Sequence, residues 1–201
     1  MAAIRARIGP EVELVAVTKG FGPDAVRAAV VAGCPMVGEN YAQEAIAKLA
    51  AVGDVGAELH FIGRLQSNKI PQLTSIVDVW ESVDRSSLLD AIAKRKPGAT
   101  VLIQVNATGE QDKGGCAPGE LAALVDHGLN LNLDVNGVMT VGPTSGDVAE
   151  TRQAFTVAKL LAVELRLPTC SMGMTHDLDI AVECGTTRVR VGTALFGARN
   201  S

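Results

Sequence analysis

The 201-residue sequence is poor in aromatic side chains, with one Trp, one Tyr and four Phe. It also lacks an excess of basic residues: 18 Lys and Arg stand against 22 Asp and Glu, a formal net charge of −4. Proteins that bind nucleic acid need cations to neutralise phosphates and often use aromatic rings to stack on bases. The composition therefore argues against nucleic acid as the main partner.

No long apolar segment is present either. The longest stretch without a charged residue, 97–109, has 13 residues, whereas a membrane-spanning helix needs about 20. The chain does not open on a basic segment followed by an apolar run, so no secretory signal is expected. We therefore expect a cytoplasmic protein that does not cross a membrane.

The four cysteines are scattered through the chain, with no CxxC pair and no histidine at ligand spacing. A structural zinc site needs clustered Cys and His ligands. In a cytoplasmic protein such cysteines are expected to stay reduced. We expect four small, mostly buried thiols and no metal site. They are Cys34, Cys116, Cys170 and Cys184.

Short Val-, Ile- and Leu-rich runs alternate with Ala-rich segments of helical period, the pattern of a parallel β/α fold. This alternation predicts an α/β chain folded as one (β/α)₈ barrel (TIM barrel) over residues 1–201. An open doubly wound sheet has the same alternation, but no GxGxxG follows the first run. The eight predicted strands are Glu13–Lys19, Pro35–Asn40, Leu59–Gly63, Ile76–Val83, Thr100–Ala107, Leu133–Val141, Thr169–Met174 and Arg188–Phe196.

Helix start and stop signals lie between these runs. Pro23 suits a first helical position and Gly33 a helix end. Asn40, with Gln43 three residues later, can cap the next helix. Asp147 predicts the start of a long helix that reaches about Arg166.

Lys19 directly follows the apolar run 14–17, at the end of the first predicted strand. Active sites of such barrels lie at the carboxyl ends of the strands. A partly desolvated lysine there has a lowered pKa and can form a Schiff base with a carbonyl. For one lysine among seven, taken alone, an ordinary surface position is the stronger interpretation.

Glycine-containing loops follow the seventh and eighth predicted strands. The Ser171 hydroxyl and the segment around Gly173, Gly192 and Thr193 can supply donors to a phosphate. The same glycines would also suit simple tight turns. Because the eighth strand of a barrel closes on the first, this phosphate cup would lie beside Lys19. A Schiff-base lysine next to a phosphate cup is what pyridoxal phosphate requires.

Five motifs extend this pattern over nearly the whole chain. They are LVAVTKG (14–20), VGEN (37–40), HFIGRLQSNK (60–69), SMGMTHD (171–177) and VRVGTALFG (189–197). Together they resemble the pyridoxal phosphate homeostasis proteins. That resemblance implies a barrel like the N-terminal domain of alanine racemase, which carries the cofactor and regulates its supply without established turnover. It also implies recipients among cofactor-dependent apo-enzymes, and we expect a monomer.

The resemblance also implies roles for single residues. Lys19 would hold pyridoxal phosphate as a Schiff base, and Arg190 would face the pyridine nitrogen. The remaining positions are implied to bind the phosphate (Ser171, Gly192 and Thr193), to shape its loop (Met172 and Gly173) and to line the ring pocket (Asn40 and His60).

Alternative interpretations remain for several of these residues. Asn40 can be a helix cap only, and His60 an ordinary core histidine. Arg188 and Arg190 share one face of their strand by alternation, and only the family motif favours Arg190.

Three positions depart from the family pattern. Met1–Pro10 stand where family members usually carry an extra helix before the first strand, so we expect either a truncated start or a shortened variant. Thr175 stands where a serine is usual. Gly20 replaces a bulkier residue after the lysine, which is expected to loosen the pocket.

Two enzymatic functions compete with the carrier. An alanine racemase-like enzyme needs a base on the second face of its substrate, and the only tyrosine is Tyr41. A sugar-phosphate lyase would need a carboxylate base at a strand end, where Glu39 is the candidate. We therefore expect a carrier with no catalytic residue and without established turnover, and weak racemisation by Lys19 alone stays as the alternative.

Overall fold

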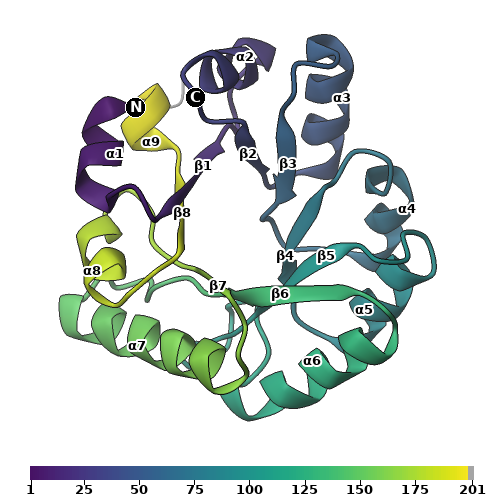
Figure 1. Ribbon diagram of the computed structural model, residues 1–201, viewed down its shortest axis with the longest axis vertical. Helices are drawn as coiled ribbons and strands as arrows, with labels where there is room; N and C mark the ends of the chain where they lie inside the picture. Colours follow the sequence, from purple (N-terminus) through teal and green to yellow (C-terminus); the bar gives the residue numbers. More distant parts are fainter. Residues whose placement is uncertain (199–201) are drawn as a thin grey trace.

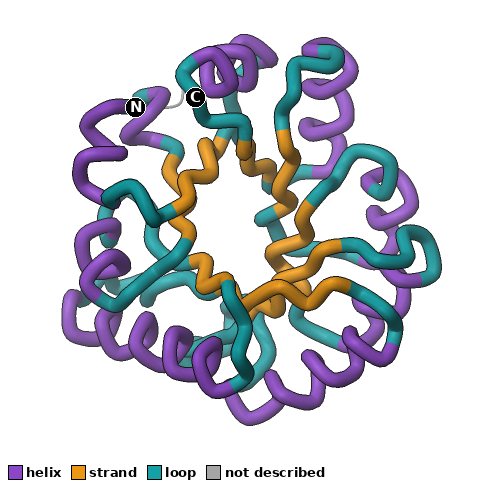
Figure 2. Tube along the Cα trace, viewed as in Figure 1, coloured by secondary structure: helices purple, strands orange, loops and turns teal. Residues whose placement is uncertain are grey.

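The computed structural model describes residues 1–198. Within them, eight parallel strands close into a barrel in the order of the sequence, and β1 pairs with both β2 and β8. The strands form the inner ring in Figure 2. Their bounds are β1 Glu13–Val17, β2 Met36–Glu39, β3 Glu58–Phe61, β4 Val79–Val83, β5 Thr100–Gln104, β6 Asp134–Met139, β7 Thr169–Ser171 and β8 Arg188–Val191. The predicted barrel is confirmed.

Helices surround this ring on the outside (Figure 1). Their bounds are α1 Ala2–Ile8, α2 Pro23–Val31, α3 Ala42–Val52, α4 Ile70–Leu73, α5 Ser86–Ala93, α6 Leu121–Asn130, α7 Val148–Glu164, α8 Leu178–Glu183 and α9 Thr193–Phe196, with short 3-10 turns at η1 Ser67–Lys69 and η2 Pro118–Glu120. In the described part of the chain, no helix is both long and apolar enough to cross a membrane.

The segment before β1 folds as α1, which packs against α8. Ile4 and Ile8 are buried on its inner side, and Arg7 forms an ion pair with Asp179 of α8 at 3.0 Å. This N-terminal segment thus covers the neighbouring helix and contributes to the core. Residues 199–201, the last of the predicted domain, lie outside the described residues.

The apolar core has two compartments because each strand shows one face to the helices and the other to the barrel axis. The large compartment lies between the sheet and the helices and includes Leu14, Val37 and Val189. The small one groups Val79, Leu102 and Met139, from three neighbouring strands. Polar side chains fill much of the remaining barrel interior.

Several predicted element boundaries were wrong. The cap of α3 is Tyr41 rather than Asn40, and no side chain accepts a hydrogen bond there. Arg188–Phe196 is a short strand followed after Gly192 by α9. The apolar residues Ile76 and Val77 precede β4, and their amides bond back to Leu73 at the end of α4. Asp147 caps α7 as predicted, by accepting from the Glu150 amide at 2.9 Å.

Candidate functional site

A cavity of about 360 Å³ lies at the carboxyl ends of the strands, where the loops after β1, β2, β3, β6, β7 and β8 meet. Five of the predicted site residues line it: Lys19, Asn40, Arg190, Gly192 and Thr193. The rest of the wall was not predicted and consists of Val17, Phe21, Ile62, Met139, Val141, Met174, Thr175, His176 and Asp177.

Lys19 lies two residues beyond β1, on a turn whose conformation depends on the next residue, Gly20. Gly20 has a φ of 75°, which glycine adopts without the steric cost that other residues meet there. Its amide donates to Glu44 Oε1 at 2.5 Å. The hydrogen bond to Glu44 ties the Gly20 end of this turn to α3.

Asn40 directly follows β2 and approaches Gly63 closely. A Cβ atom added to Gly63 would lie 2.0 Å from the Asn40 carbonyl oxygen, so only glycine allows this contact. In the described part of the chain, Asn40 Oδ1 is buried and has no hydrogen-bond partner. A buried polar atom without a partner is costly. Asn40 lines the cavity, and its buried Oδ1 is an acceptor that no described residue satisfies.

Arg190 extends from β8 into the barrel and is only 4% exposed. One guanidinium nitrogen donates to the Ser171 hydroxyl at 2.7 Å and the Ser171 carbonyl at 2.8 Å, and the other donates to the Thr140 carbonyl at 2.7 Å. Burial lowers the pKa of Arg190, and the charge of Glu81 opposes that shift. The guanidinium stays protonated in proteins, so the cavity has a fixed cation in its wall.

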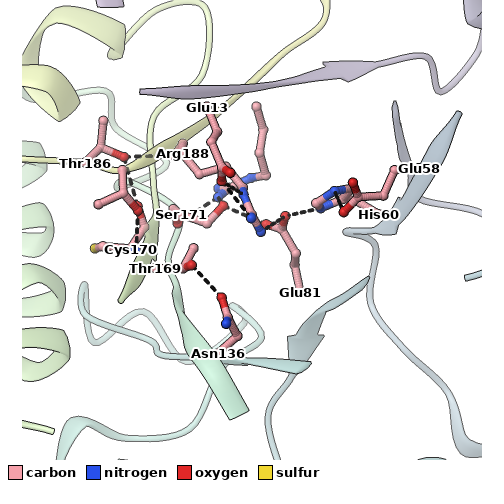
Figure 3. A network of polar contacts seen from close by, with 12 residues as sticks. Glu13, Glu58, His60, Glu81, Asn136, Thr169, Cys170, Ser171, Thr186 and Arg188 are labelled. Atoms are coloured by element: carbon pink, nitrogen blue, oxygen red, sulfur yellow. Dashed lines mark hydrogen bonds and ion pairs between the residues drawn. The ribbon is translucent and has the colours of Figure 1, made fainter. Parts of the chain in front are cut away.

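A chain of buried polar groups continues from Ser171 into the barrel (Figure 3). The Ser171 hydroxyl donates to Glu81 Oε2 at 2.6 Å, and His60 Nδ1 lies 2.6 Å from Glu81 Oε1. Glu58 Oε1 lies 3.2 Å from His60 Nε2. Arg188 lies 3.4 Å from Glu81 Oε1 and pairs with Glu13 at 2.7 Å. The network thus links one wall of the cavity to residues at the starts of β1 and β3.

The charges of this network shift two pKa values. Burial alone would raise the pKa of Glu81, but the hydrogen bond from His60 and the nearby positive charges lower it to about 2. Burial alone would lower the pKa of His60, but its carboxylate partners Glu58 and Glu81 raise it above the ordinary value. Glu81 is therefore a buried carboxylate held beside the His60 imidazole and the guanidinium groups of Arg188 and Arg190.

The remaining predicted site residues lie behind the cavity wall. Ser171 and His60 are fully buried members of the Glu81 network. Met172 is buried in the compartment between sheet and helices. Gly173 has a φ of 99° and its Cα packs against Ala181 of α8, where a Cβ would lie 2.5 Å from Ala181 Cβ.

Thr175 is one of the polar cavity residues that were not assigned to the site from the sequence. It lines the cavity, and its hydroxyl accepts from the amide of Ala194, the second residue of α9, at 3.3 Å. The signal was in the sequence, because Thr175 belongs to the SMGMTHD motif and conserves the hydroxyl of the usual serine. Phe21, also in the wall, packs against Phe196 of α9 with ring centroids 5.3 Å apart.

A parallel eight-stranded barrel with a lysine beyond β1, and a cavity of mixed apolar and polar lining at its carboxyl end, defines the class of this chain. The model of the alanine racemase N-terminal domain family matches residues 1–200. The chain belongs to this family and, within it, to the pyridoxal phosphate homeostasis proteins.

The relatives that support this assignment match over most of their length. The pyridoxal phosphate homeostasis protein of Aquifex aeolicus is 40% identical over 93% of this chain and 87% of its own. That of Pseudomonas aeruginosa is 41% identical over 94% of this chain and 85% of its own.

Solved structures agree with the fold. PipY of Synechococcus elongatus, solved with pyridoxal phosphate bound, has a TM-score of 0.89 at 34% identity, covering 98% of this chain and 97% of PipY. Alanine racemase from Bartonella henselae has a TM-score of 0.78 at 17% identity, covering 98% of this chain and 57% of the racemase. The racemase likeness concerns the fold alone.

Proposed function

We propose that this protein binds pyridoxal 5′-phosphate in the cavity at the carboxyl end of the barrel and takes part in pyridoxal phosphate homeostasis. The observation that carries the proposal is that Lys19, Arg190 and the Gly192–Thr193 segment face one cavity. The relatives named above and the structure of PipY with pyridoxal phosphate bound support it.

The residues present fit this cofactor. The cavity volume of about 360 Å³ falls within the usual range for small-molecule sites, about 300–1,000 Å³. Asn40 belongs to its wall, and its buried Oδ1 has no hydrogen-bond partner among the described residues. A Cβ on Gly192 would lie 3.1 Å from the Val17 carbonyl oxygen, so glycine keeps the β8–α9 loop close to β1.

Lys19 is the proposed attachment point. When bound, pyridoxal phosphate supplies an aldehyde that condenses with a lysine amine, with loss of water, to give a Schiff base. Arg190 would lie against the pyridine nitrogen, where its fixed positive charge disfavours protonation of the ring. This arrangement suits holding the cofactor better than driving carbanion chemistry.

For the phosphate we propose the Gly192–Thr193 segment together with the Thr175 hydroxyl. Ser171, behind the cavity wall, would position Arg190 through its hydrogen bond. His60 would contribute indirectly, through its contact with Glu81. Met172 and Gly173 would set the path of the loop that carries Thr175.

The wider role follows from the same site. We propose one cofactor-binding domain over residues 1–201 that works as a monomer in the cytoplasm and passes pyridoxal phosphate to apo-enzymes without turnover of its own. The four cysteines, all unpaired, are compatible with a reducing compartment.

The absorption spectrum of the purified protein, with and without added pyridoxal phosphate, tests the proposal. We expect a visible Schiff-base band in the native protein and in Lys94→Ala, which changes an exposed lysine. The band should be lost in Lys19→Ala. A native protein without the band at excess cofactor, or a Lys19→Ala protein that retains it, would overturn the proposal.

A further inference from the structure

A second lysine, Lys48, lies behind the turn that carries Lys19. It comes from α3, and only 3% of its side chain is exposed. Its ammonium nitrogen lies 2.7 Å from the Thr18 carbonyl oxygen, 2.5 Å from Glu39 Oε1 and 3.0 Å from Glu44 Oε1. An ammonium group has three hydrogens to donate, so these partners satisfy it completely.

The same cluster holds the backbone on both sides of Lys19. On one side, the Thr18 carbonyl accepts from Lys48, and the Thr18 hydroxyl donates to Glu39 Oε1 at 2.5 Å. On the other side, the Gly20 amide donates to Glu44 Oε1. Glu44 and Lys48 are four residues apart on α3, so they project from one face of the helix.

The packing of α3 against the barrel does not by itself require this buried charged cluster, which is energetically costly. Taking an ammonium and a carboxylate out of water has a large desolvation penalty, and apolar side chains of similar volume often pack as well. In the described part of the chain, Glu39 Oε2 is buried without a hydrogen-bond partner. Burial raises the pKa of Glu39, against the hydrogen bonds from Lys48 and Thr18. Lys48, Glu39 and Glu44 contact the turn rather than the cavity. They therefore act on the backbone around Lys19.

We propose that Lys48, together with Glu39 and Glu44, is a positioning clamp that fixes the turn of Lys19 so that its amine meets a cofactor aldehyde in the cavity. The clamp rests on the proposed function, and it adds three residues to which neither the family motif nor the cavity wall assigned a role. The clamp also assigns Glu39 a positioning role in place of the role of a lyase base.

A double-mutant cycle tests the clamp, with the dissociation constant of pyridoxal phosphate measured by equilibrium dialysis. In the native background, Lys48→Met should weaken binding about tenfold, because misplacing Lys19 removes the covalent contribution, and should diminish the visible band. In the Lys19→Ala background, Lys48→Met should change the dissociation constant less than about twofold. Lys94→Met is the matched control and should match the native protein.

Two results would overturn the clamp while leaving the proposed function intact. One is a Lys48→Met protein with native affinity and a native visible band. The other is equal weakening of binding in both backgrounds, which indicates a general structural role. Loss of the proposed function would show differently, as a native protein without the band. If Lys48→Met does not fold by circular dichroism, Glu44→Ala replaces it in the cycle. Glu44 is partly exposed, and its removal frees the Gly20 amide while the Lys48–Glu39 pair remains, so the same outcomes decide.

Discussion

The Ser171 hydroxyl lies 2.7 Å from a guanidinium nitrogen of Arg190 in the barrel interior. The same hydroxyl donates to Glu81, and the Ser171 side chain has no exposed surface. The Ser171 hydroxyl thus bridges Glu81 and the arginine in the cavity wall. Its hydroxyl is occupied on both sides, which leaves the phosphate to other residues.

Ser171→Ala is therefore predicted to weaken pyridoxal phosphate and pyridoxal, which lacks the phosphate, by the same factor. The loss should be about tenfold, the usual effect of deleting a hydrogen bond to a charged group. Thr193→Ala should instead weaken pyridoxal phosphate selectively. Dissociation constants of both ligands for both variants check this. A selective loss of pyridoxal phosphate in Ser171→Ala would return Ser171 to the phosphate site.

The free energy of unfolding is predicted to fall at acidic pH because of Glu81. Its pKa lies at about 2, below its ordinary value of 4.5, so its pairing stabilises the folded state fully above pH 4.5. The stabilisation is lost as the pH falls toward 2 and amounts to about 3 kcal/mol. The difference in unfolding free energy between native protein and Glu81→Gln, from denaturant titrations, should therefore shrink over this range.

A surface variant, Glu11→Gln, separates this effect from general acid titration. Glu11 is exposed, and its substitution should leave the pH profile of the native protein unchanged between pH 5 and 2. A difference between native protein and Glu81→Gln that stays constant with pH would mean that Glu81 is not ionised in the folded state.

Gly63→Ala is predicted to disturb the cavity through the backbone of Asn40. The new methyl group would meet the Asn40 carbonyl at 2.0 Å, and backbone on both sides cannot yield as a side chain can. We expect a loss of about 3 kcal/mol in unfolding free energy and weaker cofactor binding. Gly119→Ala, where an added Cβ meets nothing within 4 Å, should be close to neutral in both measurements.

The barrel could be predicted from the sequence because each strand is a short apolar run between helix signals. The ends of these runs were less certain, as at Thr193–Phe196, where apolar residues extend beyond the last strand as α9. Hydrophobicity alone does not distinguish a strand that continues from a short helix that packs on the same core.

The site was predicted only in part for a related reason. Motifs identify Lys19 and Arg190, but they do not tell which motif residues face the cavity and which stand behind it. His60 and Ser171 share a motif with cavity residues and yet contact Glu81. The clamp around Lys48 joins residues 18, 20, 39, 44 and 48, and only folding brings β1 beside α3.

We predict that this protein does not racemise alanine. Racemisation needs a second base opposite Lys19, and the sole tyrosine, Tyr41, is 60% exposed and is not among the described residues that line the cavity. Arg190 would also keep the ring a weak electron sink. We expect native protein saturated with pyridoxal phosphate to racemise L-alanine no faster than Lys19→Ala in the same buffer, measured by chiral chromatography. A Lys19-dependent rate would make this protein a racemase that uses a single base, and Arg190 would then have to be reassigned.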